Sequence, residues 1–218
     1  MNKAWSELNK TMQTQIKKKD TYKAGIDTLF DLRNQLMETL TSLNEKLSRE
    51  DFDAIPFINA DGYHSKTIAY SIWHIFRIED IVAHTLISED EQVFFSGNYQ
   101  RRINSPIITT GNELVKEQIA DFSKQLNMKE LYSYIYEVKD NTEKIIHSLS
   151  YDELKKKVSE ERKEHLKLLN VVSNDENAIW LIDYWCGKDI RGLIQMPFSR
   201  HWIMHIEASQ RIKNKIHS

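Results

Sequence analysis

Glycine and proline are scarce in this chain, which has only 6 glycines and 3 prolines among its 218 residues. An average protein of this length would hold about 26 of the two together. Tight turns, hairpins and strand ends depend on these two residues. The shortage therefore argues against an all-β sandwich or barrel and predicts an all-α fold.

The overall composition is that of a globular protein. Hydrophobic residues make up 40% of the chain and charged residues 28%, which is far from the composition of disordered proteins. A chain of this length can bury a substantial core in one compact unit. We expect a single domain over residues 1–218.

Charge and leader features exclude several classes of protein. The net charge is −2, so no basic field attracts a nucleic acid, and the short cluster Lys17–Lys19 is typical of a solvated helix face. The single cysteine, Cys186, rules out an internal disulfide. Residues 1–16 lack an apolar signal region, and no apolar run of 18 residues occurs. We expect a cytoplasmic protein that binds neither nucleic acid nor membrane.

Four segments show the spacing of apolar residues that predicts long amphipathic helices. In the second, Ile68, Ile72, Ile75, Val82 and Leu86 lie on one stripe, and Ser65 or Thr67 can cap the helix. The fourth starts at Pro197, a residue that suits a first helical turn. The four expected helices are Thr21–Leu47, Thr67–Leu86, Met128–Leu149 and Pro197–Ile216.

Two long connections join these helices. Residues 88–127 contain the amphipathic stretch Glu113–Leu126, and residues 151–196 contain the aromatic stretch Glu176–Cys186, which Gly187 ends. Long connections of this kind can return a chain to the far end of a helix bundle. The sequence thus predicts a four-helix core with extra helical segments in its connections.

The last expected helix carries two histidines four residues apart, His201 and His205. Residues at this spacing lie one turn apart on the same helix face, so both imidazoles can bind one metal ion. With 8 histidines in 218 residues, chance alone gives about 0.3 such pairs per chain, so the pattern is informative only in context. The helix is otherwise apolar, and buried imidazoles need partners.

His74, in the middle of the second expected helix, supplies a third imidazole. A histidine there is more often an ordinary core residue, but its flanking apolar stripe faces inward, as does the pair on the last helix. Three nitrogens from two helices can occupy one side of a metal ion and leave positions for water or substrate. We therefore predict a mononuclear metal site formed by His74, His201 and His205.

Known metal-binding patterns narrow the choice of chemistry. A zinc protease helix needs Glu directly after its first histidine, where this chain has Trp202. Carboxylate-bridged di-iron bundles need Glu-x-x-His, which the chain lacks. Gly-rich phosphate loops and Gly-x-Ser-x-Gly are absent too. Cys186 lies among aromatic residues, which favours a buried, inert thiol.

Two further residues near the second helix are weaker candidates. His64 precedes the helix in a loop and is a minor ligand candidate. Glu79 interrupts an apolar stripe, so it either accepts an imidazole N–H from a ligand as a second-layer partner or pairs with Arg77 or a lysine. The sequence leaves both roles for Glu79 open. The remaining histidines lie in charged stretches, at the terminus or off the face of His74.

The run from Lys66 to Asp80, followed by His201-x-x-x-His205 and Gln210, resembles the DinB (damage-inducible) superfamily, to which bacillithiol- and mycothiol-dependent S-transferases also belong. The resemblance covers most of the chain, with its specific motifs in the second and fourth helices. It implies a four-helix bundle in up-down-down-up order and a divalent metal held by His74, His201 and His205. It also implies a homodimer. Residues 88–127 and 151–196 make this chain longer than the compact members of the superfamily. The resemblance therefore does not define its pocket wall or any thiol-binding site.

Two functions follow as hypotheses. The first is a metal-dependent enzyme acting on a small molecule, either a transferase that uses a low-molecular-weight thiol or a hydrolase; zinc, nickel, iron and copper all suit three imidazoles. The alternative is a non-catalytic, metal-binding stress-related protein or dimeric binding module of the DinB fold. The sequence does not choose the reaction, the substrate or the metal.

Overall fold

The computed structural model describes residues 2–218, and within them it is helical with no β-strand. This confirms the all-α prediction. The longest helices are α1 (Lys3–Gln15), α2 (Tyr22–Lys46), α4 (Ile68–Asp80), α8 (Met128–Ser148) and α12 (His201–Ile216).

Shorter helices fill the connections, as the sequence predicts. They are α3 (Arg49–Asp53), α5 (Val93–Ser96), α6 (Tyr99–Ile103), α7 (Glu117–Gln125), the 3₁₀ turn η2 (Glu153–Lys155), α9 (Glu160–Leu168), α10 (Trp180–Cys186) and α11 (Ile190–Gln195). Two π-helical segments, η1 (Ile81–Ser88) and η3 (Met196–Arg200), extend α4 at its end and precede α12.

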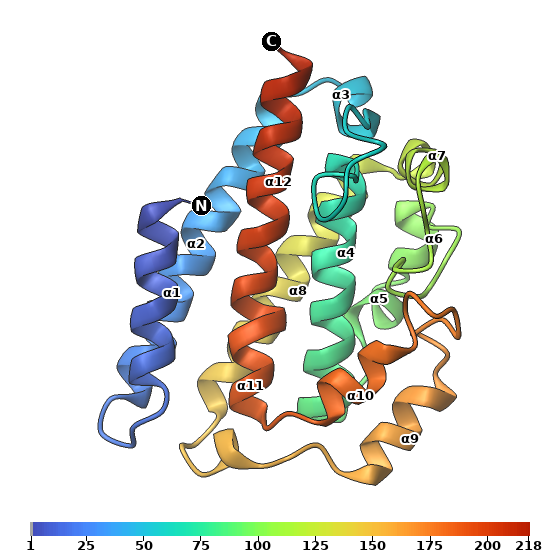
Figure 1. Cartoon of the computed structure of the whole chain (residues 1–218). Helices are drawn as coiled ribbons and strands as arrows, with labels where there is room; N and C mark the ends of the chain where they lie inside the picture. Colours follow the sequence, from blue (N-terminus) through green and yellow to red (C-terminus); the bar gives the residue numbers. More distant parts are fainter. Residues whose placement is uncertain (1) are drawn as a thin grey trace.

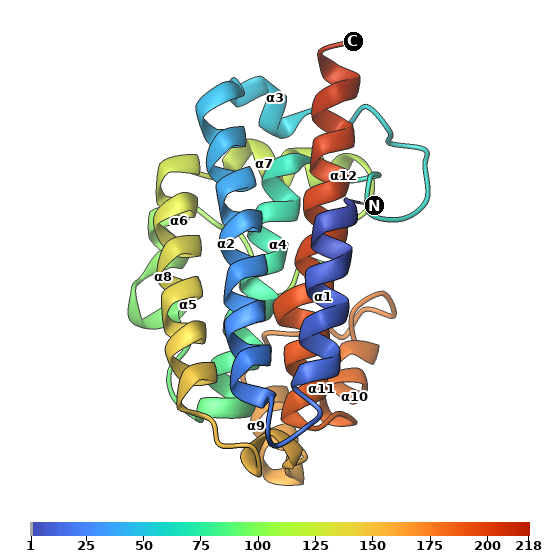
Figure 2. The same ribbon diagram turned by 90° about the vertical axis from the view of Figure 1, so that its left-hand side faces the viewer.

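The long helices lie side by side (Figure 1). Helices α2 and α12 run in one direction, whereas α4 and α8 run in the other, and α1 packs along α2 on the outside (Figure 2). Helix α4 contacts both α8 and α12, and it contacts α7 as well. This central position places one face of α4 directly against the start of α12.

Burial of α4 is complete: every residue from Ile68 to Asp80 is buried. Apolar side chains on all sides of a helix require neighbours on all sides, and α8, α12, α3 and α7 supply them. The hydroxyl of Thr67 accepts a hydrogen bond from the Tyr70 amide at 3.0 Å and caps the helix. The cap fixes where α4 begins, and thereby the depth of His74.

The helix boundaries differ from the sequence prediction at three places. The regular helix α4 ends at Asp80 instead of Leu86, because the following residues form the π-helical η1. The last regular helix begins at His201, because the residues around Pro197 form the wider π-helical turn η3. Helix α1 was not expected from residues 1–16. It forms because Asn2 caps its first turn and Trp5 and Met12 are buried.

Candidate metal centre

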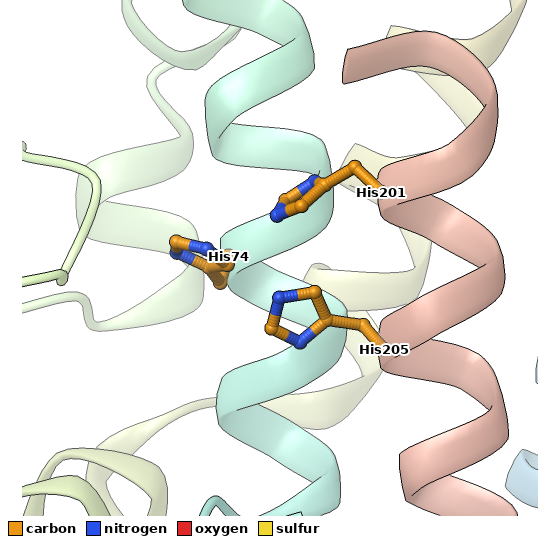
Figure 3. Close-up of side chains that lie close together, drawn as sticks. All are labelled: His74, His201 and His205. Atoms are coloured by element: carbon orange, nitrogen blue, oxygen red, sulfur yellow. The ribbon is translucent and has the colours of Figure 1, made fainter. Parts of the chain in front are cut away.

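The three histidines predicted as ligands come together in the structure. His74 on α4 points toward His201 and His205, which lie one turn apart on α12 (Figure 3). One ring nitrogen of each histidine lies within 4.8 Å of the others. Bonds from nitrogen to metal of about 2.0–2.1 Å then require only a small inward movement of the rings. The three side chains can thus share one ion.

The rings face one another without intervening side chains. Their centroids are 4.6 Å apart for His201 and His205, 4.9 Å for His74 and His205, and 5.1 Å for His74 and His201. All three residues are buried, with 3–7% of their surface exposed. The cluster therefore lies inside the helix packing rather than on an outer surface.

A backbone carbonyl sets the orientation of His74. Its Nδ1 lies 2.6 Å from the carbonyl oxygen of Thr110, and because a carbonyl only accepts, Nδ1 carries the proton. The lone pair is then on Nε2. The ring of Tyr70 stacks on the imidazole at 5.2 Å with 12° between the planes. Ligating histidines usually donate their other N–H in this way, which fixes tautomer and ring angle.

Burial keeps the three imidazoles neutral. Desolvation lowers the pKa of His74 to about 4, with the hydrogen bond to Thr110 acting in the opposite direction and the charge of Lys66 in the same one. Desolvation also lowers the pKa of His201 and His205 well below the usual value, and the neighbouring histidines add to the effect. Neutral rings have free lone pairs, the form that binds metal.

Two atoms of the cluster lack partners. Nδ1 of His201 and Nδ1 of His205 are buried and form no hydrogen bond with any residue in the described range 2–218. A buried polar atom without a partner costs about 1–3 kcal/mol. A metal ion is a group from outside the chain that fits the three-nitrogen donor set.

Glu79 has a different role from either of those the sequence suggests. Its carboxylate accepts two hydrogen bonds from Arg33, at 2.9 and 2.7 Å, and one from the indole N–H of Trp202, at 2.8 Å. All three residues are fully buried. Within residues 2–218 no hydrogen bond joins Glu79 to His74, His201 or His205, and Arg77 instead lies near Asp80. Arg33, remote in sequence, is the partner that the sequence analysis missed.

Glu79 nonetheless acts on the geometry of the cluster. Trp202 directly follows His201 in α12, and Arg33 of α2 also stacks on the Trp202 ring at 4.3 Å. Arg33 donates a further hydrogen bond to the carbonyl of Phe198 in η3, at 3.1 Å. These contacts join α2, α4 and the start of α12, so they hold His201 at a fixed position relative to His74.

A cavity of about 600 Å³ opens beside the histidines, a size typical of small-molecule sites. Its remaining wall combines the loop before α4, two further residues of α4, Asn112, helix α10 and the start of η3. The residues that line it besides the three histidines are Ala60, Asp61, Gly62, Tyr63, Ser65, Lys66, Tyr70, Ile78, Asn112, Trp180, Leu181, Tyr184, Trp185, Met196 and Pro197. Both long connections therefore contribute to the site.

Other candidates from the sequence lie elsewhere. The ring of His64 packs edge-on against Phe57 and does not line the cavity. Gln210 lines a separate hollow beside α2. Burial raises the pKa of the Cys186 thiol to about 11, so this cysteine is protonated at neutral pH; it is half-buried, whereas the sequence predicts a buried thiol.

Several residues of the site were not singled out from the sequence. Thr110 contributes a carbonyl, which any residue type offers, so no sequence signal marks it. Tyr63, whose ring lies 4.8 Å from that of His205, sits in an irregular loop. Lys66 and Trp180 gain their place only through the tertiary fold.

Among residues 2–218, every helix is too short or too polar to span a membrane. No protein-family model matches the chain, and no curated protein shows significant similarity to it.

Proposed function

We propose that this protein is a metal-dependent enzyme in which His74, His201 and His205 hold one divalent ion at the wall of a small-molecule cavity. The observation that carries the proposal is the convergence of three neutral, buried imidazoles next to a cavity of about 600 Å³. Three protein ligands leave positions open, as in catalytic metal sites. Zinc, nickel, iron and copper all suit three imidazoles.

The same proposal includes membership of the DinB superfamily. Helices α2, α4 with η1, α8 and α12 would form its four-helix bundle, and their directions in Figure 1, with α2 and α12 opposite to α4 and α8, support the up-down-down-up order. The position of the histidines on the second and fourth of these helices supports it as well. Family membership would also imply a homodimer.

Transfer of a low-molecular-weight thiol is the reaction that the cavity favours. A bound divalent ion would act as a Lewis acid that lowers the pKa of a thiol or of water. A general base would assist hydrolysis, and Asp61, on an exposed loop, is the one carboxylate among the cavity residues in the described range. The Tyr70 hydroxyl donates to the carbonyl of Gly111 at 2.9 Å, so it is not free to transfer a proton.

The residues of the chain would contribute positioning and desolvation. The Thr110 carbonyl keeps the proton of His74 on Nδ1, and the aromatic wall offers an apolar surface against which the substrate would pack. In the transfer, sulfur forms a bond to an electrophilic carbon and the leaving group departs with the electron pair of its own bond. The thiol proton passes to solvent, so no protein base is consumed. Hydrolysis by the same site is the second reaction type.

A non-catalytic metal-binding protein is the alternative. In that case the ion would join α4 to α12, and chelation would lower the melting temperature without any effect on a reaction. The cavity beside the histidines counts against it, because a purely structural ion is normally enclosed by four protein ligands.

A turnover measurement separates the two. The purified chain, loaded in turn with Zn²⁺, Ni²⁺ or Fe²⁺, would be mixed with cysteine as the thiol and monobromobimane as the electrophile. We expect at least one metal to accelerate thiol attachment in the wild type and in the exposed-histidine control His147→Ala, and none to do so in His205→Ala. Equal rates in all three proteins with every metal would refute the catalytic proposal.

A further inference from the structure

Lys66 is a cation without an anionic partner in the wall of the cavity. It lies directly before the capping residue of α4 and is partly buried. In the part of the chain that the structure describes, its ammonium group forms no hydrogen bond and no ion pair, and its Nζ lies over the Tyr70 ring, 5.5 Å from the ring centroid. Burial lowers the pKa of Lys66, as expected for a cation without a nearby carboxylate.

The rest of the cavity does not balance this charge. The three imidazoles are neutral, and a divalent ion bound by neutral ligands keeps its full charge. Asp61 is the one acidic residue among the cavity residues within 2–218, and it is exposed on its loop. A cavity with low-dielectric walls and one sign of charge attracts ligands of the opposite sign. The interior therefore favours an anionic group.

The mouth of the cavity is aromatic. Tyr63, Trp180 and Tyr184 line it and remain 39%, 49% and 36% exposed. The rings of Trp180 and Tyr184 meet edge to face at 5.6 Å, and the ammonium group of Lys188 lies 4.0 Å from the Tyr184 ring centroid. Large exposed aromatic side chains gathered at one opening mark a binding surface, and they suit a flat or apolar ligand body.

We propose that the cavity takes a small molecule with an anionic group, which Lys66 binds, and a flat apolar body, which packs against the aromatic surface of Trp180 and Tyr184. Lys66 is then the residue that selects anionic over neutral ligands. The inference rests on the proposed function in that both use the same cavity, but the contact with Lys66 requires no metal. This ligand class would then be the substrate class of the proposed metal enzyme.

The test compares three probes by calorimetric titration of the full chain, with and without Zn²⁺. Benzoate carries both the charge and the ring, benzamide the ring alone, and acetate the charge alone. We expect wild type to bind benzoate more tightly than either of the others. Lys66→Gln should weaken the affinity for benzoate roughly tenfold, as expected for the loss of a hydrogen bond to a charged group. The affinity for benzamide should be unchanged.

Matched variants control for folding and for general charge. Lys66→Arg should retain benzoate binding, and Lys144→Gln, which removes an exposed lysine on α8, should change nothing. Trp180→Ala should weaken the binding of both benzoate and benzamide and leave the binding of acetate unchanged. Equal affinity of wild type and Lys66→Gln for benzoate, or no binding of benzoate by wild type, would overturn the inference.

The outcomes also separate this inference from the proposed function. If the chain binds no metal but its metal-free form discriminates benzoate through Lys66, the metal-enzyme proposal fails and the ligand class stands. If metal binds stoichiometrically but Lys66→Gln has no effect on benzoate, the ligand class fails and the metal centre stands.

Discussion

The indole N–H of Trp202, the residue that follows His201 in sequence, donates a 2.8 Å hydrogen bond to the carboxylate of Glu79. This bond joins α12 to α4 at the level of the histidine cluster. Because Arg33 holds the same carboxylate with two further hydrogen bonds, the junction is a buried ion pair with an indole attached. The position of two of the three candidate ligands depends on it.

Glu79→Gln should therefore destabilise the protein strongly. The change leaves Arg33 buried with Glu143 as its remaining acidic partner, and breaking a buried pair costs roughly 3 kcal/mol. The matched control Asp121→Asn removes the carboxylate of an exposed pair with Lys124, which should change stability by less than about 1 kcal/mol. Urea unfolding measures both; equal effects would show that the Glu79 pair does not stabilise the helix junction.

Trp202→Phe should weaken metal binding more than it weakens folding. The variant keeps the aromatic packing and removes the N–H donor, so we expect a loss of stability of about 1 kcal/mol and a clear decrease in zinc affinity as α12 gains freedom. Trp180→Phe is the control, because its indole donates to the Asn177 carbonyl and not to a residue that joins α12 to α4. Zinc titration with a competing chelator measures the affinity, and an unchanged value in Trp202→Phe would contradict this role.

Gly111→Ala should disturb His74 through the backbone. Gly111 has φ of 77°, and a Cβ there would lie 3.0 Å from the Trp73 ring and 3.1 Å from the Tyr70 ring. The segment that carries the Thr110 carbonyl would have to shift, and with it the hydrogen bond to His74. Gly62→Ala is a close control, since Gly62 has φ of 88° with open space around its Cβ position.

Both glycine variants share the backbone penalty of a left-handed residue, about 1 kcal/mol. Only Gly111→Ala should lose additional stability and zinc affinity. Thermal unfolding and zinc titration of the two variants check this. Identical losses in both would mean that the contact of the Gly111 segment with Trp73 and Tyr70 is not needed to position His74.

The metal-free protein should lose stability as the pH falls from about 6.5 to about 4. Burial lowers the pKa of His74 to about 4 in the folded state, whereas an unfolded histidine titrates near 6.5. Between these values the unfolded chain binds more protons, so the free energy of unfolding rises with pH. The stabilising effect of the neutral imidazole is complete above about pH 6.5.

Buried carboxyl groups titrate in the same range, so the prediction concerns a difference between two proteins. The free energy of unfolding of wild type and His74→Phe, each measured in urea at several pH values, should differ in slope between about pH 4 and pH 6.5. The free energy of unfolding of wild type should rise more steeply with pH than that of His74→Phe. Parallel curves would show that His74 is not held neutral in the fold.

The long helices α2, α4, α8 and α12 were predictable because their signal is local, whereas α1 was not expected. The apolar stripe from Ile68 to Leu86 predicts α4 together with η1, although the sequence left the cap open between Ser65 and Thr67. The i, i+4 spacing of His201 and His205 places them on one face. The π-helical turn at Pro197 was not predictable, since apolar spacing of a few residues does not separate it from a regular helix.

The partners of the buried charged residues could not be predicted from the sequence. Arg33 and Glu79 are 46 residues apart, and nothing in the spacing around Glu79 points to α2. The wall of the cavity could not be predicted either, because Lys66, Asn112 and Trp180 come from three separate connections. Such groupings arise from tertiary packing, so a pattern within one segment predicts the ligands but not what surrounds them.

The most direct test of the metal centre is the metal content of the purified full chain. After dialysis against Zn²⁺ and removal of unbound ions, elemental analysis should give one zinc per chain in wild type and in His147→Ala, and a small fraction of that in His74→Ala, His201→Ala and His205→Ala. Wild type without stoichiometric zinc, nickel, iron or copper would contradict the central claim, as would full occupancy in the three histidine variants.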